Sequence, residues 1–282
     1  MEKTGMNLEF ASIWHALGWE EFAPVTELGS RPLTIQFLCS LTETPDGIEF
    51  RLFGTDYHLS WKDLSRLLGF SPRCAVSLKR ACEGYVRESF WADISGLVYS
   101  GKFVPRCNDI VHPTLRLWHK WLAITLFPQE DVRPVRSDEM LLLYAAVNQI
   151  KVAPVKAMIR QWMTNFKMIG PIECIALVTR IALRLGVLSG NPIPFIGTPR
   201  VLIDEAYLIQ GHILKRGPND SLTFFLGYAN QIPLPNPGFR LYSSESLTIP
   251  LVTQEESRCA SVSGRPTMSA AKRAHMQQQQ QS

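Results

Sequence analysis

The chain has 282 residues, of which 46% are hydrophobic and 19% charged, a composition typical of a globular protein with a packed core. Its formal net charge of +4 is only mildly basic, which excludes a polycationic nucleic-acid arm as its dominant feature. The most apolar stretch, residues 172–185, is interrupted by Glu173, Arg180 and Arg184, and this excludes a membrane span there.

Two short helices are predicted near the N-terminus. Residues 9–19 place Phe10, Ile13 and Leu17 at helical spacing, and Gly18 is a natural helix stop. The segment LTIQFLCSL, residues 33–41, predicts a second short helix.

Residues 47–60 predict a β-hairpin. Ile48, Phe50 and Leu52 alternate with charged residues, which is typical of a half-buried strand. The turn formers at residues 54–56 follow, and a returning strand begins at Tyr57.

The hairpin leads into a predicted short helix. Ser60 and Asp63 have the spacing of a capping box, and the helix carries leucines inward until Gly69 ends it. As a DNA-reading unit this segment is poor, because Lys62 and Arg66 are offset by Asp63. No second helix follows at the spacing of a helix-turn-helix, so a structural corner is favoured.

Residues 71–112 predict irregular structure apart from one short helix around Glu88 to Ser95. Four consecutive helices with proline or serine starts are then predicted, beginning at Pro113, Ser137, Pro154 and Pro171. The last of them is apolar almost all round and is therefore expected to be central. Four such helices predict a bundle-like unit.

After Asn191 several helix-breaking prolines occur, and they precede a short predicted helix at Ile203 to Ile209. From residue 230 the chain becomes rich in proline, serine and finally glutamine, which predicts a disordered, flexible tail over residues 230–282. The sequence thus predicts a mainly α domain over residues 1–229, bundle-like, with a small N-terminal β-hairpin.

Catalytic signatures are absent from the sequence, including GxSxG, the P-loop, GxGxxG and HExxH. The neighbouring acids Asp138 and Glu139 lie in the first turn of a predicted helix, where carboxylates complement the helix dipole. A metal-holding acidic triad that meets only in the fold stays open as an alternative. The sequence therefore predicts no enzyme, no cofactor or metal, and no small-molecule substrate.

The histidines with notable neighbours, His58, His112 and His119, are interpreted as structural. The six cysteines are dispersed, and no two have the two-residue spacing of zinc ligands, so we expect reduced thiols. No apolar signal segment follows Met1. These features predict a cytosolic or nuclear protein without a membrane partner.

Three predicted helices each carry a basic pair four residues apart, and these pairs are the candidate nucleic-acid-binding residues: Arg116 with Lys120, Lys156 with Arg160, and Arg180 with Arg184. Residues four apart share a helix face, so each pair could present a cationic stripe to phosphates. The alternative, solvated faces without a ligand, is favoured by the same pattern. Inward positions predict that Trp14, Trp118, Trp121 and Trp162 are core residues rather than base-stacking platforms.

The ordered segments FLCSL, GIEFRLFGTDYHLSWKDLSRLLGF, RESFWADISG, NDIVHPTLRLWHKWLAITLFPQEDVRPVRSDEMLLLYAAV and GPIECIALVTRIALRLGV resemble the first open reading frame product of Athila-type plant retrotransposons. The resemblance covers roughly residues 30–230 and rests on many weak matches in order. The hairpin followed by LxxLLGF is also similar, more distantly, to the plant mobile domain family.

The resemblance implies a gag-like protein of a mobile element, which self-associates and contacts the element's RNA. The sequence departs from a complete nucleocapsid because it lacks a CCHC zinc knuckle, and it also lacks the protease and reverse transcriptase signatures. Self-association is therefore the safer expectation, with RNA or other nucleic acid as a further partner. The alternatives are a nuclear regulatory or DNA-binding protein derived from a mobile element and a degenerate nuclease or transposase.

Overall fold

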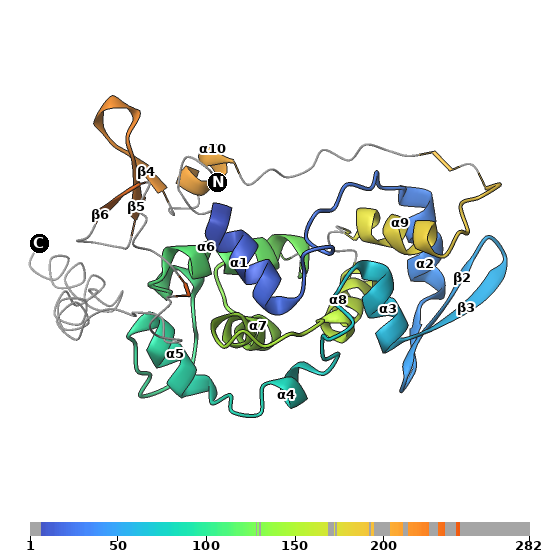
Figure 1. Ribbon diagram of the computed structural model, residues 1–282, viewed down its shortest axis with the longest axis horizontal. Helices are drawn as coiled ribbons and strands as arrows, with labels where there is room; N and C mark the ends of the chain where they lie inside the picture. The colour runs from blue at the N-terminus through green and yellow to red at the C-terminus, as the bar shows by residue number, and fades with distance from the viewer. Residues whose placement is uncertain are drawn as a thin grey trace, which may run out of the picture. The chain divides into compact units, whose positions relative to one another are not determined.

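The computed structural model describes residues 7–127, 129, 131–168, 172, 174–191, 193–194, 204–210, 214–225, 231–234 and 241–242, all within the compact unit Met1–Ile249. Helices dominate its regular structure, which confirms the predicted mainly α class (Figure 1). The helices are α1 Asn7–Leu17, α2 Arg31–Ser40, α3 Trp61–Leu68, α4 Leu78–Ala81, α5 Arg87–Ser95, α6 Pro113–Thr125, α7 Ser137–Val147, α8 Val155–Lys167, α9 Ile175–Arg184 and α10 Glu205–Gln210. The strands are β1 Thr42–Glu43, β2 Gly47–Leu52, β3 Thr55–Ser60, β4 Leu214–Arg216, β5 Leu222–Phe225 and β6 Gln231–Leu234.

The predicted hairpin is confirmed, with a tighter turn than expected. β2 and β3 pair antiparallel from Gly47 opposite Ser60 to Leu52 opposite Thr55, so the loop consists of Phe53 and Gly54 alone. Both loop residues have positive φ, 50° and 81°, as a two-residue turn that matches the strand twist requires. The sequence also missed β1, which pairs with β2 to complete the three-stranded order β1-β2-β3.

The corner after the hairpin forms as predicted. The Ser60 hydroxyl accepts the Asp63 N–H at 3.1 Å and caps α3, and Gly69 ends the helix with φ 98°. A Cβ at Gly69 would lie 2.9 Å from the Glu21 carbonyl oxygen, so glycine is needed there both for φ and for space. The corner thereby packs tightly against the loop that follows α1.

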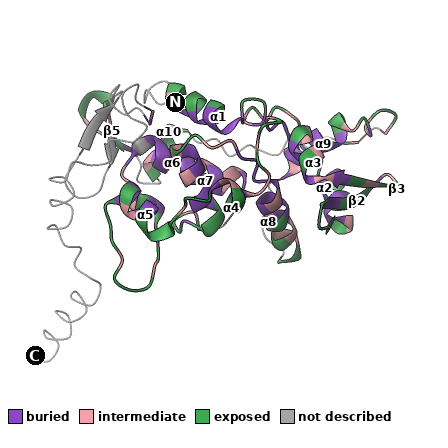
Figure 2. Ribbon diagram, turned by 60° about the horizontal axis from the view of Figure 1, so that its bottom comes forward, coloured by how far each residue is buried: buried purple, intermediate pink, exposed green. Residues whose placement is uncertain are grey.

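The four helices predicted as one bundle instead pack in two groups. α6 and α7 contact each other and α1, whereas α8 and α9 contact α2 and α3 (Figure 1). We call these the α6–α7 group and the α9 group. The buried segments of α6 and α7 lie next to each other in Figure 2. The N-cap of α7 is Arg136 and not Ser137 as predicted, so the helix begins one residue earlier than expected.

Aromatic side chains fill the core of the α6–α7 group. The predicted burial of the tryptophans is confirmed for Trp118 in that group and for Trp162 on α8. Trp19 is fully buried, its ring 5.8 Å from that of Trp118, and its indole N–H donates to the Val152 carbonyl at 2.6 Å. Trp14 and Trp121 are half-buried and pack edge to face at 6.1 Å. The indole ring of Trp19 thus ties the end of α1 to the start of α8.

The sequence also missed structure in two other places. α4 lies within the segment predicted to be irregular, and β4, β5 and β6 form a second antiparallel sheet in sequence order. β6 falls in the segment predicted as a tail, as do Leu241, which is buried, and Tyr242, whose hydroxyl donates to the Ala146 carbonyl at 2.6 Å. The remaining residues of that segment lie outside the described part of the chain, and the predicted boundary at residue 230 stays a prediction. No helix among the described residues is long and apolar enough to cross a membrane.

Candidate functional site

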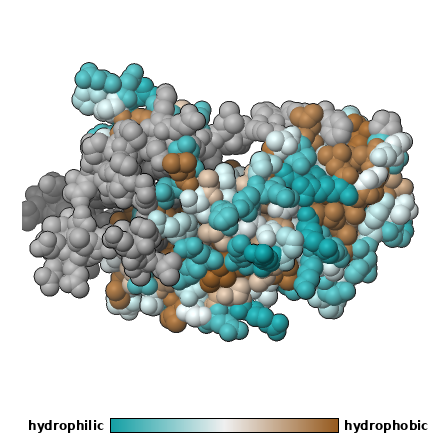
Figure 3. Space-filling model, viewed as in Figure 1, coloured by the Kyte–Doolittle hydropathy of each residue, from teal (hydrophilic) through white to brown (hydrophobic). Residues whose placement is uncertain are grey.

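The six predicted nucleic-acid-binding residues differ in exposure. Arg116, Lys120 and Arg180 are 3%, 4% and 2% exposed, so the expectation that each pair forms an outward stripe is wrong for the α6 pair and for half of the α9 pair. Lys156 is half-buried, and Arg160 and Arg184 are exposed. Figure 3 shows hydrophilic patches separated by apolar ones, rather than one continuous hydrophilic surface, on the face seen there.

The α6 pair lies inside the protein, and Arg116 has a hydrogen-bond partner there. The Arg116 Nε donates to the Ile110 carbonyl oxygen at 2.7 Å. Burial lowers the pKa of Arg116 to about 10, and the nearby Cys107 and Asp109 oppose this shift. The guanidinium therefore stays charged at neutral pH while it holds the segment before α6 in place.

The α9 pair does share one face, as predicted, but this face meets the end of α3. Arg180 donates to the Phe22 and Leu68 carbonyls at 2.9 and 3.0 Å, and Arg184 donates to the Arg66 and Leu67 carbonyls at 3.2 and 3.1 Å. The last carbonyls of a helix lack partners within it and carry partial negative charge, so both guanidiniums complement this helix end.

Arg180 also holds the loop between α1 and α2. Its Nε and Nη2 donate to the two carboxylate oxygens of Glu27 at 2.7 and 2.9 Å, and Nη2 reaches the Pro24 carbonyl at 2.7 Å. Burial alone would raise the pKa of Glu27, but the Arg180 hydrogen bond and charge lower it below its usual range. This arrangement gives Arg180 a structural role.

The α8 pair faces the first sheet and α3. The Lys156 ammonium lies 5.0 Å from the centroid of the Trp61 ring, a cation–π distance. Arg160 forms a two-pronged ion pair with Glu43 of β1, at 2.8 and 3.1 Å. Of the predicted cations, Lys156, Arg160 and Arg184 thus keep contact with solvent, and nucleic-acid binding stays a prediction for them.

The structure reveals a buried ionisable cluster that sequence reasoning missed, formed by Cys107, His119 and Glu139. The His119 Nε2 lies 3.1 Å from Glu139 Oε2, and these side chains are 0% and 1% exposed. Burial opposes protonation of His119, but the contacts with Cys107 and Glu139 outweigh it and raise its pKa to about 9. The predicted structural interpretation of His119 agrees with this position in the core.

Glu139 is the centre of the cluster and not merely a first-turn acid, as the sequence suggested. Besides His119 it accepts the Gln129 side-chain N–H at 2.7 Å and the Arg136 backbone N–H at 2.8 Å. The last contact is half of a capping box, and the Arg-Ser-Asp-Glu spacing at the start of α7 was the signal that could have revealed it. Cys107 is fully buried, so its sulfur is inaccessible to a substrate despite its histidine and carboxylate neighbours.

A cavity of about 120 Å³ lies between α7 and α8. Arg136 and Arg160 line it together with Asp138 and Glu139, so opposite charges face one another across it. Burial raises the pKa of Asp138, although Arg160 and Lys79 oppose the shift. Ligand pockets usually measure roughly 300 to 1,000 Å³, so this cavity is small for an organic substrate.

Comparison with known families gives one match. Residues 30–152 match the ATHILA ORF-1 family. These residues form an Athila-type retrotransposon ORF1 domain. The finding confirms, over these residues, the family suggested by the sequence. Neither the curated proteins nor the solved structures give a match.

The ORF1 domain begins just before α2 and ends at Val152, before α8. It therefore contains the hairpin, the capped corner and the buried Cys107–His119–Glu139 cluster. It also contains His112, which is buried and accepts the Leu115 N–H at the start of α6, and His58, which is exposed and lies 3.5 Å from Asp46. Among the described residues no group of three His, Cys, Asp or Glu side chains is arranged to hold a metal ion.

Proposed function

We propose that the protein is a non-enzymatic, gag-like structural protein of a retrotransposon, which self-associates and binds RNA weakly through exposed basic side chains. The match of residues 30–152 to the ATHILA ORF-1 family carries the proposal, because retroelements encode their gag-like structural protein in the first reading frame. The arrangement of the polar core supports it. Glu139 and Arg180 both form their hydrogen bonds with side-chain and main-chain groups of the same chain.

RNA binding through the candidate residues would be weak and insensitive to sequence, because three of the six reach solvent and two of these three already contact other side chains. Arg160 has Glu43 as a partner, and Lys156 lies over the ring of Trp61. Binding that rests on such charges falls steeply with salt, because it depends on counterion release from the phosphates. We expect the same affinity for unrelated single-stranded RNAs of equal length.

The RNA test uses the full chain in a filter-binding assay at several salt concentrations. We expect replacement of Lys156, Arg160 and Arg184 together by glutamine to weaken binding and to reduce its dependence on salt. Lys167→Gln, which removes one exposed charge from the end of α8, shows how much the loss of a single unrelated charge weakens binding. Equal binding by the triple variant and the native chain would remove these residues from the proposal.

Self-association is tested by light scattering over a range of protein concentrations. Mass that rises with concentration supports the gag-like role. A monomer at every concentration that prefers one duplex sequence would instead support the regulatory, DNA-binding alternative. Metal-dependent cleavage of nucleic acid would overturn the non-enzymatic proposal.

A further inference from the structure

Within the described part of the chain, the outer edge of β3 carries main-chain groups without hydrogen-bond partners. Both the N–H and the C=O of Arg51 bond the Ser40 hydroxyl, at 2.9 and 3.1 Å, and therefore point away from β3. Arg51 and its opposite residue Asp56 are thus a non-hydrogen-bonded pair, in which the groups of Asp56 also point outward. The Glu49 carbonyl likewise faces Thr42 of β1, so His58, opposite Glu49, directs its groups outward too.

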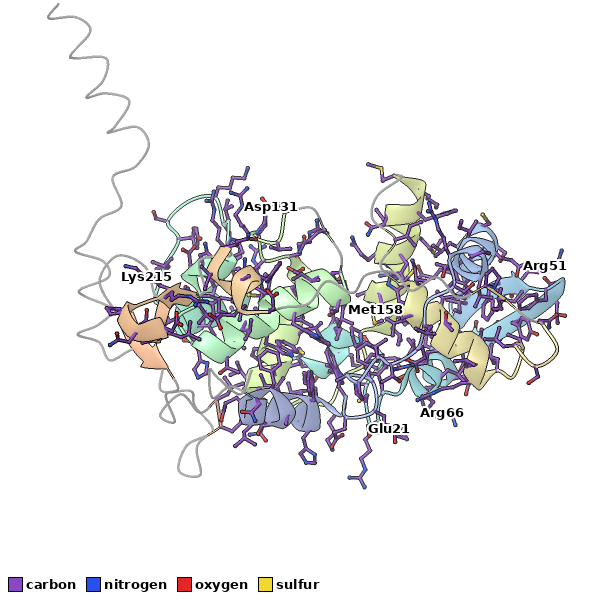
Figure 4. The ribbon with its side chains drawn as sticks, turned by 90° about the horizontal axis from the view of Figure 1, so that it is seen from above. Glu21, Arg51, Arg66, Asp131, Met158 and Lys215 are labelled. Carbon is purple, nitrogen blue, oxygen red and sulfur yellow. The ribbon has the colours of Figure 1, made fainter. Side chains whose placement is uncertain are left out.

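This edge lacks most of the usual protections against pairing with another strand, and its one acid, Asp56, is ion-paired with Arg51. β3 has six residues, contains neither proline nor lysine, and pairs with β2 without a bulge. Within the described residues no backbone hydrogen bond outside the β2–β3 ladder involves Asp56 or His58. In Figure 1 the hairpin extends beyond the helices around it, and Figure 4 shows Arg51 at its margin.

We propose that β3 pairs antiparallel with β3 of a second copy of this chain, around a two-fold axis at Tyr57. The positions of the outward groups fix this register. Asp56 and His58 must each face a residue whose groups also point outward, and a two-fold axis at Tyr57 places Asp56 opposite His58 of the second copy. A register centred on His58 would pair Asp56 with Ser60, whose main chain already begins α3, and one centred on Asp56 would pair His58 with Gly54 of the turn.

Side-chain charges on the exposed face suit this register. Arg51 holds Asp56 through a two-pronged ion pair at 2.6 and 2.7 Å. Across the axis, each row would read Arg51, Asp56, then His58 and Glu49 of the second copy, with acids next to basic groups throughout. Opposite charges directly across strands stabilise a sheet, and like charges destabilise it.

The other face of the sheet adds an aromatic contact. Tyr57 is half-buried and stacks on Phe50 with ring centroids 5.5 Å apart, and Phe50 lies 4.8 Å from Phe37 of α2. In the proposed register Tyr57 meets Tyr57 of the second copy as a non-hydrogen-bonded pair, where side chains approach most closely. The ring ladder would then continue across the axis. This inference rests on the proposed self-association and assigns one contact of it.

The first experiment measures self-association of the full chain by light scattering and sedimentation. His58→Glu would place two acids opposite each other in both rows, and we expect it to weaken association about tenfold. Thr42→Glu is the matched control, since it adds the same charge at the opposite edge of the same sheet and should leave association unchanged. Circular dichroism verifies that both variants fold.

The second experiment tests the register by disulfide formation in a Cys39→Ser background, because Cys39 is the exposed thiol among the described cysteines. Tyr57→Cys places the new thiols opposite each other at the axis, so we expect rapid formation of a cross-linked dimer under mild oxidation. Thr55→Cys, opposite Leu59 of the second copy in this register, should cross-link much more slowly.

The outcomes separate the inference from the proposed function. Association of the native chain that is weakened by His58→Glu but not by Thr42→Glu, with selective cross-linking at position 57, supports the β3 pairing. Association that His58→Glu leaves unchanged, without selective cross-linking at position 57, overturns the pairing and leaves the gag-like role intact. A native chain that stays monomeric at every concentration overturns both.

Discussion

The two helix groups stabilise buried charge in different ways. In the α6–α7 group, His119 and Glu139 come from two helices and pair side chain to side chain, 20 positions apart in sequence. In the α9 group, Arg180 uses its guanidinium mainly to bind main-chain carbonyls and a carboxylate in other segments, with Glu27 153 positions away. The first arrangement depends on protonation, and the second depends on the geometry of a planar cation.

This difference predicts which changes of sequence or pH should destabilise each group. A guanidinium stays charged at any ordinary pH, so alkali should not weaken the α9 group, whereas acid that protonates Glu27, whose pKa is lowered by Arg180, should. A buried histidine with a raised pKa must lose its proton as the pH rises, so the α6–α7 group should respond to alkali. A rise in pH therefore probes the His119–Glu139 pair, and substitution of Arg180 probes the α9 group.

The largest effect is expected for Arg180→Leu. The substitution leaves Glu27 and the carbonyls of Phe22, Pro24 and Leu68 without their donor, and breaking a buried ion pair from one side costs about 3 to 5 kcal/mol. We expect the free energy of unfolding to fall by about 3 kcal/mol, because Glu27 can partly reach water. Urea denaturation followed by circular dichroism measures it.

Arg180→Lys sharpens this test. A lysine keeps the charge but cannot donate along the several directions of the guanidinium fork, so stability should remain well below that of the native chain. If Arg180→Lys were as stable as the native chain, the positive charge alone would explain the stabilisation. The claim that the α9 group depends on the geometry of the guanidinium would then be wrong.

The next effect is a pH dependence carried by His119. Its folded-state pKa is about 9, above the ordinary value of about 6.5, so its protonation stabilises the fold fully below about pH 6.5. This stabilisation is lost as the pH rises through 9. Integrated over this window, the shift corresponds to about 3 kcal/mol at most.

Glu139→Gln isolates that contribution. Glutamine can still accept the Arg136 N–H, but it removes the negative charge beside His119. The variant should be less stable at pH 6, and the difference from the native chain should shrink toward pH 9, as measured by urea denaturation at each pH. Parallel pH curves for the two proteins would show that the pair does not control the α6–α7 group.

A smaller effect is expected at the corner between the hairpin and α3. Ser60→Ala removes the hydroxyl that caps the Asp63 N–H, a change that typically costs about 1 kcal/mol. The matched comparison is Ser60→Thr, whose hydroxyl can both accept the Asp63 N–H and donate to the Asp63 carboxylate, and which should recover most of the loss. Thermal unfolding of the three proteins ranks their stabilities. Equal unfolding midpoints would show that the cap does not stabilise the α9 group.

Local signals explain what the sequence predicted well. Glycine at 18 and 69, the Ser60 cap and the proline at 113 act within a turn of the chain, so their positions alone predict where elements begin and end. The alternation around Phe50 acts at the same short range. The family resemblance added what these signals could not supply, the retrotransposon origin of residues 30–152.

Long-range contacts explain what the sequence analysis did not predict. The four-residue spacing of Arg180 and Arg184 correctly predicts a shared face, but only tertiary packing determines that this face meets the end of α3 rather than solvent. The same holds for Glu139, whose partners His119 and Gln129 lie in other segments. β1 is too short for its alternation to be recognised, with only two residues.

The smallest predicted effect distinguishes the two members of the α9 pair. Arg184 donates to the Arg66 and Leu67 carbonyls from an exposed position, where water replaces the lost donor, so Arg184→Ala should cost about 0.5 kcal/mol. Urea denaturation of this variant beside Arg180→Leu measures the contrast on one helix face. A loss as large as that of Arg180→Leu would mean that capping the end of α3, rather than tying it to the loop between α1 and α2, holds the α9 group together. A loss near 0.5 kcal/mol assigns that role to the contacts that only Arg180 makes, with Glu27 and the Phe22 and Pro24 carbonyls.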